Sequence, residues 1–213
     1  MHVAFDIGNV LVEMKLDIFT SELKKYIPAD EDPNFLLEDL QAAQDIGLNT
    51  VRRYLQTHYG IKDASVLNIL MNAWNASLIP NHMMLNFMDN LKSEGVKIAL
   101  LSNMGMEHAA YLRQSCPVMF DGHVEHLSYE VGARKPTKLY FQSFLMDHDE
   151  FTGAVYLDDR DENLMIGKKY SFKSFKFDLD YILKQPLSKQ KIELEKVKSY
   201  IFDRKYDKIA EKA

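Results

Sequence analysis

Apolar and polar positions along this chain form short apolar runs that alternate with longer amphipathic stretches. Continuous apolar runs, typical of strands buried on both faces of a sheet, occupy residues 2–7, 96–102 and 154–159. Apolar residues recur at helical spacing over residues 83–92, 105–115, 136–147 and 162–170. Strands that alternate with helices form parallel sheets, so the pattern predicts an α/β fold with a doubly wound parallel sheet of the Rossmann-like type.

Three further segments give weaker patterns. Residues 120–126 are typical of a short strand or a turn, and the aromatic-rich residues 171–177 indicate an edge strand. Residues 188–213 are rich in Lys and Glu, which predicts a solvated amphipathic helix.

A different pattern interrupts the alternation between residues 15 and 79. Apolar residues recur there at helical spacing, as at residues 66–74, and proline or glycine separates the helical stretches. A continuous α/β domain would need strands in this region, and no β-branched run supplies one. We therefore expect an inserted helical cap domain at 15–79, and an α/β core domain formed by 1–14 and 80–213.

Composition narrows the class of protein. With 46% hydrophobic and 27% charged residues the chain resembles a soluble globular protein, and its net charge of −5 argues against a nucleic-acid or membrane-surface partner. No apolar run approaches the roughly 20 residues that cross a bilayer, and the acidic residues within 1–25 argue against a signal peptide. The lone Cys116 excludes an intrachain disulfide and fits a reducing compartment. We expect a cytoplasmic protein.

Acidic residues end two of the predicted strands. Asp6 follows the first apolar run, and Asp158 and Asp159 follow the run that starts at Ala154. The carboxyl ends of parallel strands meet at one edge of a sheet, where open α/β sheets bind their ligands. Because Mg²⁺ prefers oxygen ligands, these acids predict a magnesium site, although each also has a structural explanation as a turn residue.

Polar residues at two other segment ends are candidates for binding an anion. Ser102 and Asn103 directly follow a predicted buried strand, and Lys135 precedes Pro136 at the start of a predicted helix. A hydroxyl, an amide and an ammonium group donate hydrogen bonds or positive charge to phosphate. Taken singly, each has an ordinary alternative as a helix cap or a surface lysine.

The four elements together, in this order, resemble the haloacid dehalogenase-like (HAD) hydrolase superfamily. The resemblance is carried by FDIGNVL, ALLSN, GARKP and YLDDRDEN and spans about residues 2–170. The insertion after the first strand resembles the small helical cap of these enzymes. With the Gly-Asn pair in its first motif, the chain is most similar to the sugar-phosphatase-like branch of the superfamily.

The resemblance implies a nucleophile and a metal site. Asp6 would be the nucleophile and would form an aspartyl-phosphate. Mg²⁺ would be held by Asp6, the backbone carbonyl of Gly8 and Asp159, with Asp158 assisting directly or through water.

The resemblance also implies a phosphate site. Ser102 and Asn103 would bind the transferring phosphoryl group, and Lys135 would offset the charge of nucleophile and phosphate. The implied function is a Mg²⁺-dependent phosphomonoester hydrolase acting on a small phosphorylated metabolite, such as a sugar phosphate. The oligomeric state stays open.

One position departs from the family pattern, because most phosphatases of the superfamily carry a general acid where this chain has Gly8. Another acid could replace it, and Glu13, Asp45 and His58 are candidates. Alternatively, substrates with good leaving groups need less protonation, or the chain is a weakly active or inactive phosphate-binding protein. Dehalogenases also lack this acid, but they need no metal, so the pair Asp158-Asp159 argues against dehalogenation.

Large apolar residues of the insertion have two interpretations. They line a specificity pocket, or they form a helical core, and their helical spacing favours the core. These residues are Tyr54, Tyr59, Met71 and Trp74, with Met83 and Met84 just beyond.

Overall fold

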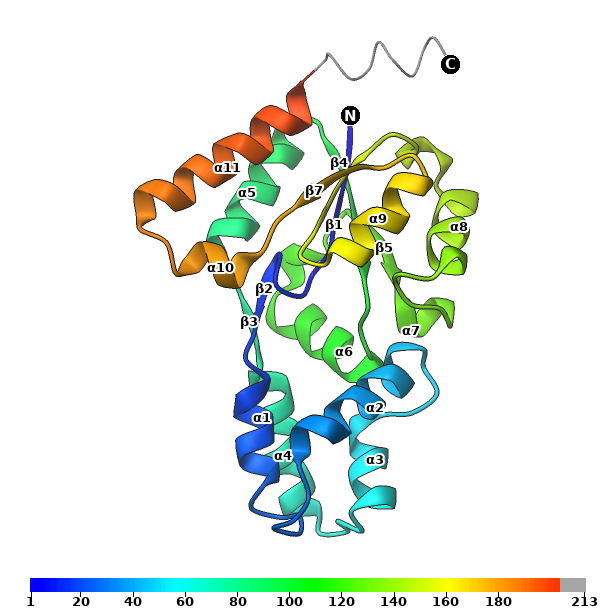
Figure 1. Ribbon diagram of the computed structural model, residues 1–213, viewed down its shortest axis with the longest axis vertical. Coiled ribbons are helices and arrows are strands. Elements are labelled where there is room, and N and C mark those ends of the chain that lie inside the picture. The colour runs from blue at the N-terminus through cyan, green and yellow to red at the C-terminus, as the bar shows by residue number, and fades with distance from the viewer. Residues whose placement is uncertain (204–213) are drawn as a thin grey trace.

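The structure, a computed structural model, describes residues 1–203, and their side chains except those of residues 34–39. Five parallel strands form the main sheet, in the order β5-β4-β1-β6-β7. These are β1 (His2–Phe5), β4 (Lys97–Ser102), β5 (Val124–Leu127), β6 (Val155–Asp158) and β7 (Lys173–Lys176). The chain adds strands on one side of β1 and then returns to the other side, so the predicted doubly wound α/β fold is confirmed (Figure 1).

Successive residues of the central strands point to opposite faces of the sheet. Val3 and Phe5 belong to one apolar cluster, and Ala4 between them belongs to another. The first cluster includes residues of α5 (His82–Ser93), α6 (Met106–Ser115), α10 (Leu179–Leu183) and α11 (Leu187–Phe202). The second includes residues of α8 (Lys138–Asp147) and α9 (Asp161–Lys169). Helices on both faces explain why these strands are continuous apolar runs.

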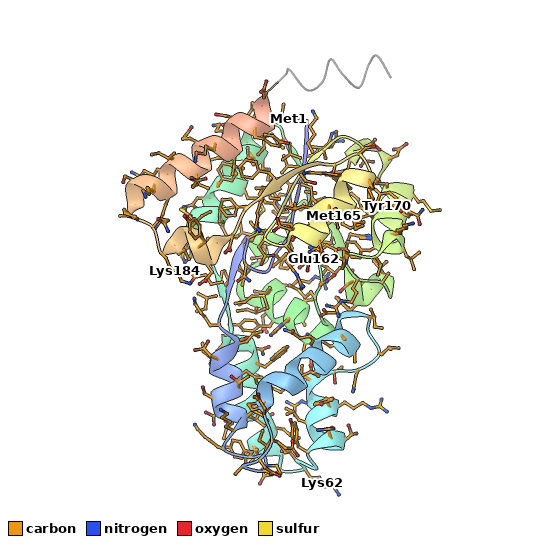
Figure 2. All side chains as sticks on the ribbon, viewed as in Figure 1. Met1, Lys62, Glu162, Met165, Tyr170 and Lys184 are labelled. Atoms are coloured by element: carbon orange, nitrogen blue, oxygen red, sulfur yellow. The ribbon has the colours of Figure 1, made fainter. Side chains whose placement is uncertain are left out.

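The helices between residues 16 and 76 pack together beside the carboxyl edge of the sheet, and we call them the helical group (Figure 1). They are α1 (Leu16–Leu23), α2 (Pro33–Asp45), α3 (Val51–His58) and α4 (Ala64–Ala76). A separate apolar cluster fills their interior, where the rings of Phe19 and Trp74 meet edge to face, 4.9 Å apart. Lys62 lies at the far end of this group, at the opposite end of the molecule from Met1 (Figure 2). The assignment of this group as a cap domain stays a prediction.

Polar residues fix the starts of three helices. The side chains of Thr50, Asp63 and Asn81 accept hydrogen bonds from backbone N–H groups in the first turns of α3, α4 and α5. These caps satisfy donors that would otherwise lack partners, which explains why the helices begin there.

The sequence pattern missed a small antiparallel ribbon. Strands β2 (Val12–Met14) and β3 (Leu78–Pro80) pair where the chain enters and leaves the helical group, with Val12 opposite Pro80 and Met14 opposite Leu78. Strands of three residues are too short to show an apolar period, so residue pattern alone could not find them.

Other boundaries shift by a few residues. In the segment 120–126 the strand begins only at Val124, and the short helix α7 (Ser128–Val131) follows it. The predicted C-terminal helix is observed from Leu187 to Phe202, and residues 204–213 of that prediction lie outside the described residues. Within residues 1–203, no helix has both the length and the apolar character required to cross a bilayer.

Candidate active site

The acids predicted at the strand ends lie together. Asp6 directly follows β1, Asp158 ends β6, and Asp159 is the next residue. The backbone N–H of Asp6 donates to the carbonyl of Leu157 at 2.9 Å, which sets the two strand ends side by side. One carboxylate oxygen of each acid lies within 4.8 Å of the others. This acid cluster (Asp6, Asp158 and Asp159) lies at the switch point of the sheet, between β1 and β6.

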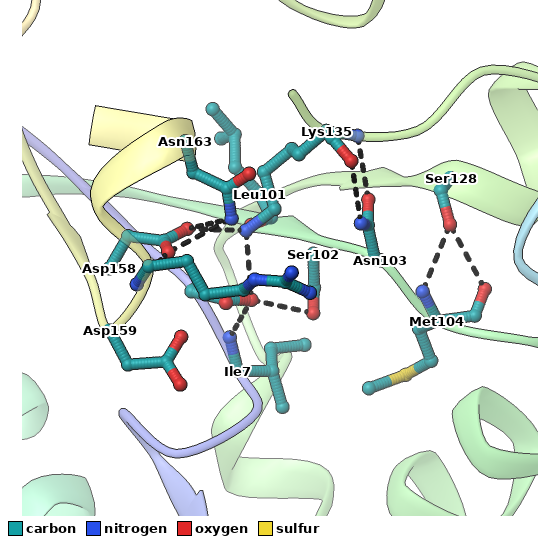
Figure 3. Close-up of polar contacts among 12 residues, drawn as sticks. Ile7, Leu101, Ser102, Asn103, Met104, Ser128, Lys135, Asp158, Asp159 and Asn163 are labelled. Carbon is teal, nitrogen blue, oxygen red and sulfur yellow. Dashed lines mark hydrogen bonds and ion pairs between the residues drawn. The ribbon is translucent and has the colours of Figure 1, made fainter. Parts of the chain in front are cut away.

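Lys135 is buried inside this site and its ammonium group has three acceptors. Nζ lies 2.7 Å from Asp158 Oδ2, 3.0 Å from Asp6 Oδ1 and 2.7 Å from the carbonyl oxygen of Leu101 (Figure 3). Three acceptors satisfy the three donors of an ammonium group. Burial disfavours the charged form, but the two carboxylates outweigh it and raise the pKa of Lys135 above its usual value. Lys135 therefore carries a fixed positive charge.

Asp158 anchors Lys135 and is completely buried. It accepts hydrogen bonds from the Lys135 ammonium, the backbone N–H of Arg160 at 2.8 Å, the amide of Asn163 at 2.9 Å, and the hydroxyl of Tyr156. Burial raises the pKa of a carboxyl group, but Lys135 and these donors outweigh burial and lower the pKa of Asp158. Both Asp158 oxygens are engaged with donors, so its direct contact with a metal stays a prediction.

Asp159 is the more accessible acid of the pair. Its Oδ2 accepts a hydrogen bond of 3.2 Å from the Asn9 amide. Asn9 adopts a left-handed conformation, with φ at 53°, in the loop after β1. This loop residue, which the sequence interpretation missed, ties the two strand ends together.

Ser102 ends β4, Asn103 directly follows it, and the two side chains make different contacts. The Ser102 hydroxyl donates to Asp6 Oδ1 at 2.8 Å, so together with Lys135 it fixes the Asp6 carboxylate. The Asn103 side chain instead binds the backbone of Lys135, donating to its carbonyl at 2.9 Å and accepting from its N–H at 2.7 Å. This arrangement holds Lys135 in place, and direct contact of Asn103 with a phosphoryl group stays a prediction.

The acid cluster carries more negative charge than its neighbours neutralise. Burial raises the pKa of Asp6 to about 7, opposed by Lys135 and reinforced by the two neighbouring acids. Burial and the adjacent Asp158 also raise the pKa of Asp159. At about 4 Å and an effective dielectric near 20, two unit charges interact by roughly 4 kcal/mol. A divalent cation at the acid cluster would relieve this repulsion, so these oxygen donors fit Mg²⁺.

A polar pocket of about 440 Å³ opens beside the acid cluster. One side, which we call the strand-edge wall, is formed by Asp6, Ser102, Asn103, Lys135 and Asp159. The other side, the α2 wall, is formed by Gln41, Gln44 and Asp45 at the end of α2. Arg134 and Arg160 also line it. The volume suits a small organic molecule.

Met14 occupies the space beside Gly8. A Cβ atom added to Gly8 would lie 2.7 Å from Met14 Sδ, and both residues line the pocket. The space beside Gly8, two residues after Asp6, therefore holds a thioether where the family pattern has a carboxylic acid.

Of the three candidates for the missing acid, Asp45 lines the pocket, whereas Glu13 and His58 lie apart from it. Glu13 accepts a hydrogen bond from Asn81, and His58 stacks on Tyr54 at the end of α3. Neither residue lines the pocket. The large apolar residues of the insertion do not line it either, and Trp74 and Met71 are buried in the helical group. For these residues the core interpretation is the correct one.

Comparisons with known proteins identify the fold. No family model and no curated protein matches the chain. Among solved structures, a HAD-family enzyme from Bacteroides thetaiotaomicron, crystallised with magnesium and inorganic phosphate, is 20% identical, with a TM-score of 0.71 over 82% of this chain and 92% of that one.

Two further structures are more distant. A predicted HAD-like hydrolase from Porphyromonas gingivalis is 16% identical, with a TM-score of 0.65 over 87% of this chain and 98% of that one. An L-2-haloacid dehalogenase from Xanthobacter autotrophicus, with chloropropionic acid covalently bound, is 16% identical, with a TM-score of 0.56 over 81% and 75% of the two chains. The chain therefore has the HAD fold, and for the fold the resemblance predicted from the sequence is confirmed.

Proposed function

We propose that this protein is a Mg²⁺-dependent phosphatase that hydrolyses a small phosphorylated metabolite, such as a sugar phosphate, through an aspartyl-phosphate at Asp6. The observation that carries the proposal is the Asp6 carboxylate, which is held by Ser102 and Lys135 beside a second acid, Asp159, at a polar pocket. The lone Cys116 and the acidic net charge support a cytoplasmic location and a small-molecule partner.

Each residue of the strand-edge wall has a part in the proposed chemistry. Asp6 attacks phosphorus, and Ser102 and Lys135 keep its carboxylate oriented. Lys135 also offsets the charge of the incoming phosphate, and Asn103 keeps Lys135 in place. Asp6, the carbonyl of Gly8 and Asp159 would hold Mg²⁺, with Asp158 assisting directly or through water. When bound, Mg²⁺ supplies positive charge that draws a phosphate dianion toward the carboxylates.

The helical group is proposed to act as the cap domain, and this domain is proposed to extend over residues 15–79. Its α2 wall faces the strand-edge wall across the pocket, so its side chains select the substrate. The similar enzyme crystallised with magnesium and inorganic phosphate supports phosphate chemistry. Asp159, the second of the two acids at the end of β6, favours phosphate chemistry over dehalogenation.

Phosphate release from a panel of esters tests the proposal. The protein is incubated with Mg²⁺ and sugar phosphates, nucleotides or 4-nitrophenyl phosphate. We expect release that a chelator stops and Mg²⁺ restores, and that Asp6→Asn lowers by about a thousandfold or more. Release that persists in Asp6→Asn at the parent rate would remove Asp6 from its role.

A second candidate is a phosphate-binding protein without turnover, and Gly8 with its Met14 neighbour favours it. The test is Gly8→Asp combined with Met14→Ala, which gives the new carboxylate room, with Met14→Ala alone as control. A parent protein at background that becomes active only in the double variant supports the binding protein. An active parent supports the phosphatase.

A further inference from the structure

Asp45 is a buried acid that the chemistry proposed above does not use. It is the last residue of α2, only 6% of its surface is exposed to solvent, and it lines the same pocket as Asp6. Its Oδ2 lies 3.5 Å from Nη2 of Arg134, a long ion pair, and its carboxylate also interacts with the Gln44 side chain. A carboxylate resists burial unless strongly paired, and acids kept in pockets against this penalty are often functional.

Two glycines bring the end of α2 close to α6 and α7. The helix ends in a Schellman motif, in which Leu48 N–H donates to the carbonyl of Ala43 and Gly47 N–H to that of Gln44, both at 3.0 Å. Gly47 has φ at 74°, and a Cβ atom there would lie 2.8 Å from the backbone oxygen of Tyr129 in α7. The end of α2 is therefore seated directly on the backbone of α7.

The second close approach involves the side chain that precedes Asp45. A Cβ atom added to Gly105, at the start of α6, would collide with the side-chain oxygen of Gln44. Gln44 is itself buried at the pocket. Contacts on both sides of Asp45 thus fix its position relative to the acid cluster.

The other titratable residues of the described pocket are less suited to proton transfer. Asp6 and Asp159 belong to the acid cluster, and Lys135 is held by three acceptors. His108 donates from Nε2 to the carbonyl of Trp74 at 3.0 Å, and burial lowers its pKa to about 4. Its ring is therefore neutral and its proton is committed to Trp74. Asp45 lies on the wall opposite the acid cluster, which is the side from which a leaving group would extend.

We propose that Asp45 is the proton donor and acceptor that replaces the acid missing at Gly8. This inference rests on the proposed phosphatase function. In the first step Asp6 bonds to phosphorus, the bond from phosphorus to the ester oxygen breaks, and that oxygen takes its electron pair and the proton of Asp45. In the second step water bonds to phosphorus and gives a proton to Asp45. The bond from phosphorus to Asp6 then breaks, which releases phosphate and restores both acids.

The electrostatic surroundings of Asp45 are compatible with both roles. Burial raises the pKa of Asp45 to about 6, although Arg134, Lys135 and Arg160 act in the opposite direction. Proton transfer is most efficient when the pKa lies near the operating pH, because both protonation states are then accessible.

The decisive experiment compares two leaving groups in the full-length protein with Mg²⁺. Glycerol phosphate releases an alkoxide that needs a proton, whereas 4-nitrophenyl phosphate releases a stable phenolate. We expect Asp45→Asn to lower the first step on glycerol phosphate by about 100-fold or more. On 4-nitrophenyl phosphate we expect an initial burst of nitrophenol at nearly the parent rate, followed by slow turnover, because water then lacks its base.

Controls separate the outcomes. Asp63→Asn, the same change at an exposed cap of α4, should leave both reactions unchanged. Equal losses of the first step on both esters in Asp45→Asn would indicate a structural role, and an unaffected glycerol phosphate reaction would exclude proton transfer; either overturns the inference. If the parent releases no phosphate in an Asp6-dependent manner from either ester, the proposed function itself fails.

The parent protein provides a test that needs no variant of Asp45. The rate of the first step on glycerol phosphate, divided by that on 4-nitrophenyl phosphate, should fall as pH rises through about 6, because Asp45 loses the proton it must donate. A ratio that stays constant with pH contradicts the inference.

Discussion

The two walls of the pocket are held by different kinds of interaction. On the strand-edge wall, Lys135 joins Asp6 and Asp158 through charged contacts of 2.7–3.0 Å from buried strand ends. On the α2 wall, Asp45 makes one long ion pair, and its position depends on the close approach of Gly47 to Tyr129 and of Gln44 to Gly105. The first wall is therefore held by opposite charges that neutralise one another, whereas the second keeps a weakly paired acid near its titration range.

The largest expected effect comes from removing the cation of the strand-edge wall. Lys135→Met leaves two buried carboxylates without their partner, so the free energy of unfolding should fall by about 3–5 kcal/mol. Denaturant titration measures this change, with Lys138→Met, an exposed lysine nearby, as control. A loss below about 1 kcal/mol, the range of exposed ion pairs, would show that the network does not hold this wall together.

A smaller effect, with a defined pH dependence, is expected from Asp45. Because burial raises its pKa to about 6, the folded protein binds a proton there more tightly than the unfolded chain. This contribution to stability is present at pH 4 and below and is lost as the pH rises to about 6. A shift of about two pKa units corresponds to at most about 3 kcal/mol.

Unfolding of the parent and of Asp45→Asn at pH 4 and pH 7 measures this difference. The variant should gain stability relative to the parent as the pH rises. Asp63→Asn should change in the opposite direction, because the hydrogen bonds that the Asp63 carboxylate accepts from Ser65 lower its pKa. Parallel pH curves for the parent and Asp45→Asn would contradict the account of the α2 wall.

The smallest expected effect on stability comes from two glycines with positive φ, Gly47 and Gly60, of which only Gly47 is also in close contact with another segment. Gly47→Ala and Gly60→Ala both place a side chain at positive φ, which costs roughly 1–2 kcal/mol. Only at Gly47 does the new Cβ meet a backbone oxygen, since nothing lies within 4 Å at Gly60. Gly47→Ala should therefore also slow the first step on glycerol phosphate by about tenfold or more, because Asp45 is displaced.

Stopped-flow kinetics and denaturant titration on the two variants separate these effects. Equal catalytic rates in both variants would mean that the contact with Tyr129 does not position Asp45.

The strand-edge wall was largely predictable from the sequence. Of the α2 wall, only Asp45 was named from the sequence, as one of three candidate acids, and its place in the pocket was not predictable. The apolar runs before Asp6, Ser102 and Asp158 mark buried parallel strands, and strand ends meet at one edge by geometry alone. The position of Asp45 depends on contacts between α2 and residues about 60 or more positions later in the chain, which no local pattern encodes.

Two smaller features show the same limit. Asn9 was visible in the first motif, but its hydrogen bond to Asp159 joins residues 150 positions apart. The β2–β3 ribbon is too short to produce a periodic signal. The sequence thus indicates the structure where burial dictates residue type, but not where long-range packing decides which residues meet.

Acid-quenched mass spectrometry detects the aspartyl-phosphate on Asp6, on which the proposed function and the proposed role of Asp45 both depend. The protein is mixed with Mg²⁺ and 4-nitrophenyl phosphate, quenched during turnover, digested and analysed for covalent phosphate. We expect one phosphoryl group on the peptide that contains Asp6, more abundant in Asp45→Asn and absent in Asp6→Asn. Phosphate released during turnover without any label on Asp6, or a label on another residue, would show that Asp6 is not the nucleophile.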